Sequence, residues 1–168
     1  RSGPLEIVPD LVPTIAFVEE PKHTHRGVLR IAFEAQDDYG ISEIALELGP
    51  KVRPEETERL ALQKPSSQPG KFASASYTDL LAHPYAGLPV VMRLAAIDGI
   101  GQEGKSGPLE LTLPERQFKH PLAKAVIAQR KQLVAEPEDR ERIAARIAAL
   151  GESKAALDVA TSVPLSLR

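Results

Sequence analysis

The fold of this chain is decided by residues 27–48, GVLRIAFEAQDDYGISEIALEL. Large apolar side chains alternate with polar or small ones on both sides of the central Asp-Asp-Tyr-Gly: Leu29, Ile31 and Phe33 before it, and Ile44, Leu46 and Leu48 after it. A period of two on either side of an Asp/Gly cluster is typical of paired β-strands with one buried face. The stretch therefore predicts a strand, a tight polar turn and a second strand.

Shorter segments before and after this stretch also have the composition of β-strands. Alternation or β-rich composition between turn signals predicts further strands at residues 14–18, 59–63, 72–77, 90–97 and 109–113. About seven short strands separated by Gly- and Pro-containing turns indicate an antiparallel β-sandwich. We therefore expect residues 1–114 to form an immunoglobulin-like β-sandwich, in a chain that is mainly β.

The composition changes near Glu115. Residues 1–114 carry 11 Lys and Arg against 16 Asp and Glu, whereas residues 115–168 carry 10 against 7. Of the 15 prolines and 11 glycines, 12 and 10 precede Glu115. Beyond it, apolar residues recur every three or four positions, which predicts helices. We expect an α-helical extension over 115–168, made of two or three short helices, with Pro121 and Pro137 in the first turns of two of them.

The expected helices have apolar stripes that need a partner surface. The stripe residues are Leu122, Val126, Leu133, Ile143, Ile147 and Leu150. Helices of three or four turns, including a third short one at residues 153–160, are not stable alone in water. The stripes would therefore pack against the sandwich, against another part of the same polypeptide, or against a second copy in a homo-oligomer.

Two loops hold the candidate ligand-binding residues, which are Asp37, Asp38, Tyr39 and Asp98. In an immunoglobulin-like sandwich, residues 27–36, 41–48 and 90–97 would be strands B, C and F, so the B–C and F–G loops share one end. Three carboxylates with loop carbonyls suit Ca²⁺, and an exposed Tyr39 suits a cell-wall saccharide. The simpler interpretation is turn capping, because Asp side chains accept hydrogen bonds from the backbone two residues on.

The residues that several classes of function require are absent from this sequence. The absence of cysteine excludes disulfides and thiolate metal sites, and no Ser or Cys nucleophile sits in a recognisable elbow. His83 precedes a proline, so we expect a turn residue with a satisfied ring. The net charge of −2 argues against nucleic-acid binding, and no apolar run approaches the roughly 18 residues that span a bilayer. We therefore expect a protein that is not an enzyme and has no cofactor other than Ca²⁺.

Motifs along the chain resemble two kinds of known domain. MRLAAIDGIG at residues 92–101 looks like the F strand and F–G turn of fibronectin-type-III and other immunoglobulin-like domains. A second set comprises DDYG at 37–40, DL at 79–80 with AHPYAGLP at 82–89, residues 98–104, and LPERQF at 113–118 followed by HPLA at 120–123. In these motifs and their order, the chain resembles a family of large bacterial inner-membrane proteins named domain of unknown function forty-one seventy-five.

The family resemblance implies a location rather than an activity. It implies transmembrane helices before this segment, a place on the periplasmic face of the inner membrane, and a long polar tail after the segment. The first residue, Arg1 rather than Met, likewise indicates a piece of a larger protein. We therefore expect a non-catalytic interaction or spacer module that contacts a protein partner or the rest of its own chain, with ligand binding at the loop end as the alternative.

Overall fold

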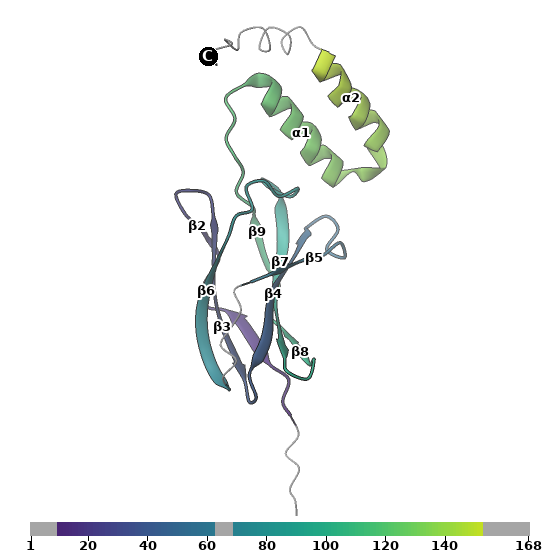
Figure 1. Ribbon diagram of the computed structural model, residues 1–168. Coiled ribbons are helices and arrows are strands. Elements are labelled where there is room, and N and C mark those ends of the chain that lie inside the picture. The colour runs from purple at the N-terminus through teal and green to yellow at the C-terminus, as the bar shows by residue number, and fades with distance from the viewer. Residues whose placement is uncertain (1–9, 63–68, 153–168) are drawn as a thin grey trace, which may run out of the picture.

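The computed structural model of this protein describes residues 10–62 and 69–152, whose strands form two antiparallel sheets (Figure 1). The first sheet contains β1 (Thr14–Phe17), β2 (Lys22–His23), β3 (Leu29–Asp37) and β6 (Gly70–Thr78). The second sheet contains β4 (Ile41–Pro50), β5 (Glu58–Ala61), β7 (Pro89–Asp98), β8 (Glu103–Lys105) and β9 (Leu109–Thr112). We call the two sheets together the two-sheet body.

Each sheet is organised around its longest strands. In the first sheet, β3 pairs with β6 on one side and with β1 and β2 on the other. In the second sheet, β4 pairs with β5 and β7, and β7 pairs in turn with β8 and β9. Every predicted strand segment is confirmed over the described residues, and so is the antiparallel, mainly β character. Residue 63, the predicted end of the strand at 59–63, lies outside the described residues. The short strands β2 and β8 form where the sequence indicates turns.

The two sheets share one hydrophobic core. Its side chains come from alternate positions of the long strands, and Ile31, Phe33, Leu46 and Leu94 are among those with no more than 1 % of their surface exposed. The ring of Phe33 packs edge-on against Phe72 of β6, with the ring centroids 6.5 Å apart. Because each fully buried side chain of this size contributes about 1.5–3 kcal/mol, this core is the main source of the stability of the body.

The pairing predicted for residues 27–48 is wrong, although both strands are present. β3 belongs to the first sheet and β4 to the second, so the two do not pair with each other. The short turn between them carries the chain across the core, and Gly40 supplies a positive φ of 108° at its end. A period of two shows which face of a strand is buried, but it does not identify the neighbouring strand.

Glycine at position 104 allows the lead-in of the chain to reach the second sheet. A Cβ atom at Gly104 in β8 would lie only 1.7 Å from the carbonyl oxygen of Pro13, so any other residue would displace one of these segments. Beyond this point, β1 contacts β7 and β8 as well as its own partner β3. The edge strand of the first sheet is thereby held against the second sheet.

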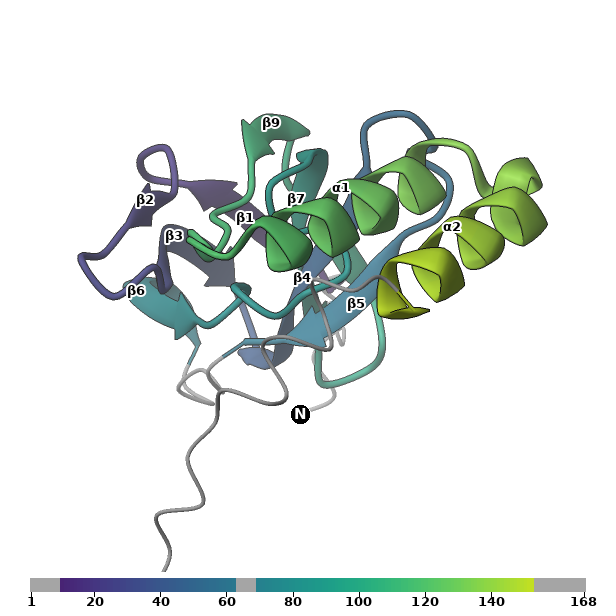
Figure 2. The ribbon, with the colours of Figure 1, turned by 90° about the horizontal axis from the view of Figure 1, so that it is seen from above.

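Two helices pack against each other at one end of the body (Figures 1 and 2). They are α1 (Pro121–Ala135) and α2 (Arg140–Glu152), joined by a 3₁₀ turn at Pro137–Asp139, and we call them the helical pair. Both predicted starts are confirmed, because Pro121 begins α1 and Pro137 begins the turn into α2. The third predicted helix, residues 153–160, lies outside the described residues. Within 10–62 and 69–152, no helix has the length and apolar character that a membrane crossing requires.

Candidate functional site

The predicted ligand residues lie in two adjacent loops, at the end of the body away from the helical pair (Figure 1). Asp37 is the last residue of β3 and Asp98 is the last residue of β7, and Asp98 pairs with Ile41 at the start of β4. The two aspartates are only 4 % and 2 % exposed. The prediction that these loops share one end is confirmed.

Each buried aspartate caps the turn that follows it. Asp37 Oδ2 accepts hydrogen bonds from the backbone N–H groups of Tyr39 and Gly40, at 3.0 and 2.5 Å. Asp98 Oδ1 accepts two bonds in the same way from the turn after β7, at 2.9 and 2.8 Å. The other oxygens, Asp37 Oδ1 and Asp98 Oδ2, are buried without a hydrogen-bond partner. These contacts are the turn capping that the sequence offered as the simpler interpretation.

A fourth aspartate, which sequence reasoning missed, lies at the same end. Burial raises the pKa of Asp10 in the lead-in to β1, and a hydrogen bond with Asp38 together with the charges of Asp38, Asp98 and Asp37 raises it further. The exposed Asp38 is therefore the carboxylate with the largest effect on the pKa of Asp10. A residue in a proline-rich lead-in has no periodic neighbours, so the sequence contains no signal for its position.

The geometry at this end limits the chemistry available. Throughout residues 10–62 and 69–152, no three carboxylate or imidazole groups lie close enough together to hold one metal ion. Tyr39 is 63 % exposed, which is the solvent-facing position that the saccharide alternative requires. Binding of Ca²⁺ or of a saccharide stays a prediction, while the capping role of Asp37 and Asp98 is directly visible.

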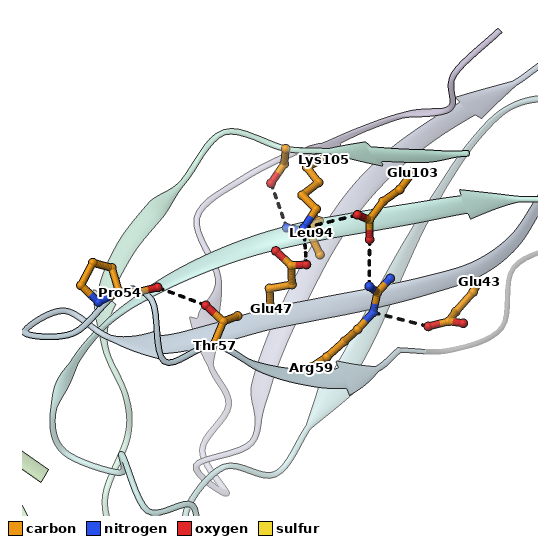
Figure 3. Close-up of polar contacts among 9 residues, drawn as sticks. Glu43, Glu47, Pro54, Thr57, Arg59, Leu94, Glu103 and Lys105 are labelled. Atoms are coloured by element: carbon orange, nitrogen blue, oxygen red, sulfur yellow. Dashed lines mark hydrogen bonds and ion pairs between the residues drawn. The ribbon is translucent and has the colours of Figure 1, made fainter. Parts of the chain in front are cut away.

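A network of charged side chains covers part of the outer face of the second sheet (Figure 3). Arg59 of β5 lies 2.8 Å from a carboxylate oxygen of Glu103 and 3.6 Å from one of Glu43, and Lys105 donates to Glu47 at 2.6 Å. Burial alone raises the pKa of Glu103, but the hydrogen bond from Arg59 and the charge of Lys105 outweigh it, and the net pKa is lowered. Each of the three carboxylates in this network has a basic partner, and such exposed ion pairs contribute little to stability.

At the opposite end, beside the helical pair, a turn is organised by His83. The Nδ1 atom of His83 accepts a hydrogen bond from the N–H of Tyr85 at 3.1 Å, and its Nε2 atom lies 3.0 Å from Oε2 of Glu58. Because Nδ1 acts as an acceptor, the ring proton is on Nε2 and is donated to Glu58. The predicted turn residue with a satisfied ring is confirmed, and neither ring nitrogen is free for a metal or a substrate.

Arg130 of α1 binds the same turn through its backbone. The guanidinium group of Arg130 donates to the carbonyl oxygens of His83 and Ala86, at 2.9 and 2.5 Å. A planar guanidinium group presents several N–H donors in a fixed arrangement, so one side chain reaches both carbonyls. Residues 82–89, one of the motifs on which the family resemblance is based, therefore form the surface that α1 contacts.

Two further contacts complete the junction between α1 and the body. Lys131 lies 2.7 Å from Glu115 in the linker, and Arg53 donates to the carbonyl oxygen of Val134 at 2.5 Å. Glycine is required at position 87, where φ is +75° and a Cβ atom would lie 2.2 Å from Oε2 of Glu115. Sequence reasoning missed this junction, because Arg130 and Lys131 have the pattern of ordinary solvent-facing helix residues and Arg53 lies in a charged loop between β4 and β5.

The predicted partner-contact residues of the helices fall into two groups. Ile143 is fully buried in α2, which packs against α1. The remaining five are half-buried or exposed: Leu122, Leu133 and Leu150, then Val126 at 39 % and Ile147 at 38 %. One position of the stripe is therefore covered within the chain, and the exposed positions remain available to a partner.

Comparisons with known proteins add one finding to this geometry. A family model described as "Domain of unknown function (DUF4175)" matches residues 1–168, which is the whole chain. A search of curated proteins gives no match. The family that the motifs resemble is thereby confirmed, and no activity comes with it.

Proposed function

The chain belongs to the family described as Domain of unknown function (DUF4175), and from this premise we propose that it is a non-catalytic interaction or spacer module of a membrane-anchored bacterial envelope protein. The proposed location is the periplasmic face of the inner membrane, with the membrane spans in other segments of the parent protein. The resemblance of the motifs to large inner-membrane proteins supports this location.

The body is proposed to be an immunoglobulin-like β-sandwich that occupies residues 1–114, with 115–168 as a separate helical unit. Its strand order supports this assignment. β1, β3 and β6 occupy the places of strands A, B and E, whereas β5, β4, β7 and β9 occupy those of C′, C, F and G. The crossing of the chain between β3 and β4 is then the B–C connection between the two sheets.

The observation that carries the spacer role is the attachment of the helical pair at one end of the body while the chain enters at the other (Figure 1). Asp10 lies beside the β3–β4 loop, and the junction made by Arg53, Arg130 and Lys131 lies at the far end. In this arrangement the lead-in and the helical pair lie at opposite ends of a rigid two-sheet body. Such a body keeps the segments that flank it apart.

A distance measurement tests this role. The chain has no cysteine, so Ile100→Cys in the β7–β8 loop and Ala148→Cys in α2 give two specific spin-label sites. We expect a narrow distribution of distances between the labels. Arg130→Gln should broaden it, because the hydrogen bonds that attach α1 to the His83 turn are lost. A broad distribution in the otherwise unchanged chain would contradict the spacer role.

The interaction role has a separate test. The exposed side chains of Val126 and Ile147 are proposed to contact a protein partner or another segment of the parent protein. We expect immobilised wild-type chain to retain a partner from envelope extract, and the double variant Val126→Asp/Ile147→Asp to lose it. Retention that is unchanged in the double variant would show that the partner binds elsewhere.

Cation binding at the loop end is the second candidate. It is favoured by one observation, the two buried and unpartnered oxygens Asp37 Oδ1 and Asp98 Oδ2. Calorimetry with millimolar Ca²⁺, with Asp38→Asn as the comparison, tests it. Heat of binding that Asp38→Asn removes would support an ion site, whereas no heat and no rise in melting temperature would remove this candidate.

A further inference from the structure

One edge of the long strand β6 pairs with no strand among the described residues. In the described part of the chain, β6 hydrogen-bonds β3 alone, over nine residues in continuous register from Gly70 to Thr78. Both views of the molecule show β6 at the margin of the first sheet (Figures 1 and 2). Unpaired N–H and C=O groups along such an edge are a template for pairing with another strand.

The other edge strands differ from β6 in ways that prevent pairing. β1, β2, β5, β8 and β9 have only two to four residues each. β1 is also held against β8, and β5 carries Glu58 and Arg59. Short length, charge and cover are the usual protections of an edge. β6 has none of them apart from Lys71 near its start, and its central residues are small.

The sequence of β6 is suited to antiparallel pairing with itself. When Ala75 is placed opposite Ala75 of a second copy, Ser74 faces Ser76 and Ala73 faces Tyr77. In the same register Lys71 falls opposite Asp79, once at each end of the pair. Cross-strand neighbours of opposite charge stabilise a sheet.

We propose that β6 is a homodimerisation edge, at which two copies of this chain join their first sheets into one continuous antiparallel sheet about a two-fold axis at Ala75. An isologous contact of this kind is self-complementary and closes at two copies. The inference deepens the proposed interaction role and rests on it, but it uses a surface different from the exposed apolar residues of the helical pair.

Sedimentation of the chain over a range of concentrations tests the proposal. Ala75 lies on the face of β6 away from the core, opposite Ala32 in the register, so a longer side chain there leaves the core intact. We expect the wild-type chain to dimerise, and Ala75→Lys to raise the dissociation constant about tenfold, because like charges then meet at the axis. Ala16→Lys on β1, the opposite edge of the same sheet, is the matched control and should dimerise normally.

A charge exchange tests the register. Lys71→Glu alone places Glu opposite Asp79, and Asp79→Lys alone places Lys opposite Lys71, so each variant should dimerise less than wild type. A mixture of the two should form a heterodimer in which both end pairs are again of opposite charge. Hydrogen exchange should show β6 amides protected in this mixture and in concentrated wild type, but not in either variant alone.

Two results would overturn the proposal. The first is a wild-type chain that is monomeric at millimolar concentration. The second is a dimer that Ala75→Lys leaves intact and that Val126→Asp dissociates, because the helical pair would then be the contact. That second result would leave the proposed interaction role standing, so the two failures are distinguishable.

Discussion

The two-sheet body and the helical pair are both well-formed secondary structure, but they bury their apolar side chains to different degrees. The body surrounds a continuous cluster that both sheets share. Among the described residues of the helical pair, α1 has no fully buried side chain and α2 has one, Ile143. Hydrophobic burial therefore stabilises the body, whereas charged side chains attach the helices to it.

This comparison shows that secondary structure and stability are separate properties here. Helices of 15 and 13 residues are marginal in water unless they pack against something. The helical pair obtains that packing from the mutual contact of its helices and from the junction at Arg53, Arg130 and Lys131. We expect the body to fold without the helices, and the helices to depend on the body.

The largest effect is expected in the core of the body. Leu94 lies at the centre of β7, opposite Leu46, and is fully buried. Leu94→Ala should lower the free energy of unfolding by about 2–5 kcal/mol, the range for a large-to-small change in a packed core. Urea denaturation followed by circular dichroism measures it, and Leu11→Ala, at a residue that is 65 % exposed, is the control. A loss of less than 1 kcal/mol at Leu94 would contradict the comparison.

A smaller and local effect is expected in the helical pair. Ile143→Ala should lower the free energy of local opening of α2 by about 2 kcal/mol, because it removes the one buried apolar contact of that helix. Hydrogen exchange should show faster exchange in α1 and α2 with unchanged exchange in β4 and β7. Ile147→Ala, one turn further along and 38 % exposed, is the matched control. Equal destabilisation of body and helices would show that they unfold as one unit.

The polar junction sharpens the comparison further. Arg130→Gln removes the donors to His83 and Ala86, and should lower the free energy that holds α1 to the body by about 1–3 kcal/mol. Arg130→Lys should restore little of it, because an ammonium group lacks the planar array of donors. Hydrogen-exchange rates of the α1 amides measure this loss of free energy, and Arg116→Gln is the control. Full restoration by lysine would mean that charge alone makes the contact.

The smallest effect is expected at the acidic end of the body. The folded state raises the pKa of Asp10, through burial first and Asp38 second. Stability from a raised carboxyl pKa is fully present below the unfolded pKa and is lost as the pH rises through the folded pKa. Asp38→Asn should therefore flatten the decline of melting temperature over this acidic interval. Glu55→Gln, at an exposed carboxylate, is the control and should keep the wild-type decline. If the melting temperature of Asp38→Asn declined with pH as steeply as that of wild type, the Asp10–Asp38 interaction would be excluded.

The fold was predictable from sequence wherever a local pattern reports burial. Alternation located the strands, and Pro121 and Pro137 located the helix starts, because these signals depend on neighbouring residues only. The proximity of Asp37 to Asp98 was predictable as well, once residues 27–48 and 90–97 were taken as strands of a sandwich. Asp10 and Arg130 were not predictable, since their partners are distant in the chain and their own neighbours carry no pattern.

The sequence by itself determined which face of each long strand is buried, where the strands and helices begin, and that its Asp-rich segments are turns. Only the tertiary structure decided between the two predictions for residues 27–48, paired strands or strands B and C of different sheets. Only the tertiary structure also showed that Arg130 attaches α1 to the His83 turn and that β6 pairs with β3 alone among the described strands. The physical reason is that periodicity records the environment of a residue, whereas pairing depends on distant segments that compete for the same backbone hydrogen bonds.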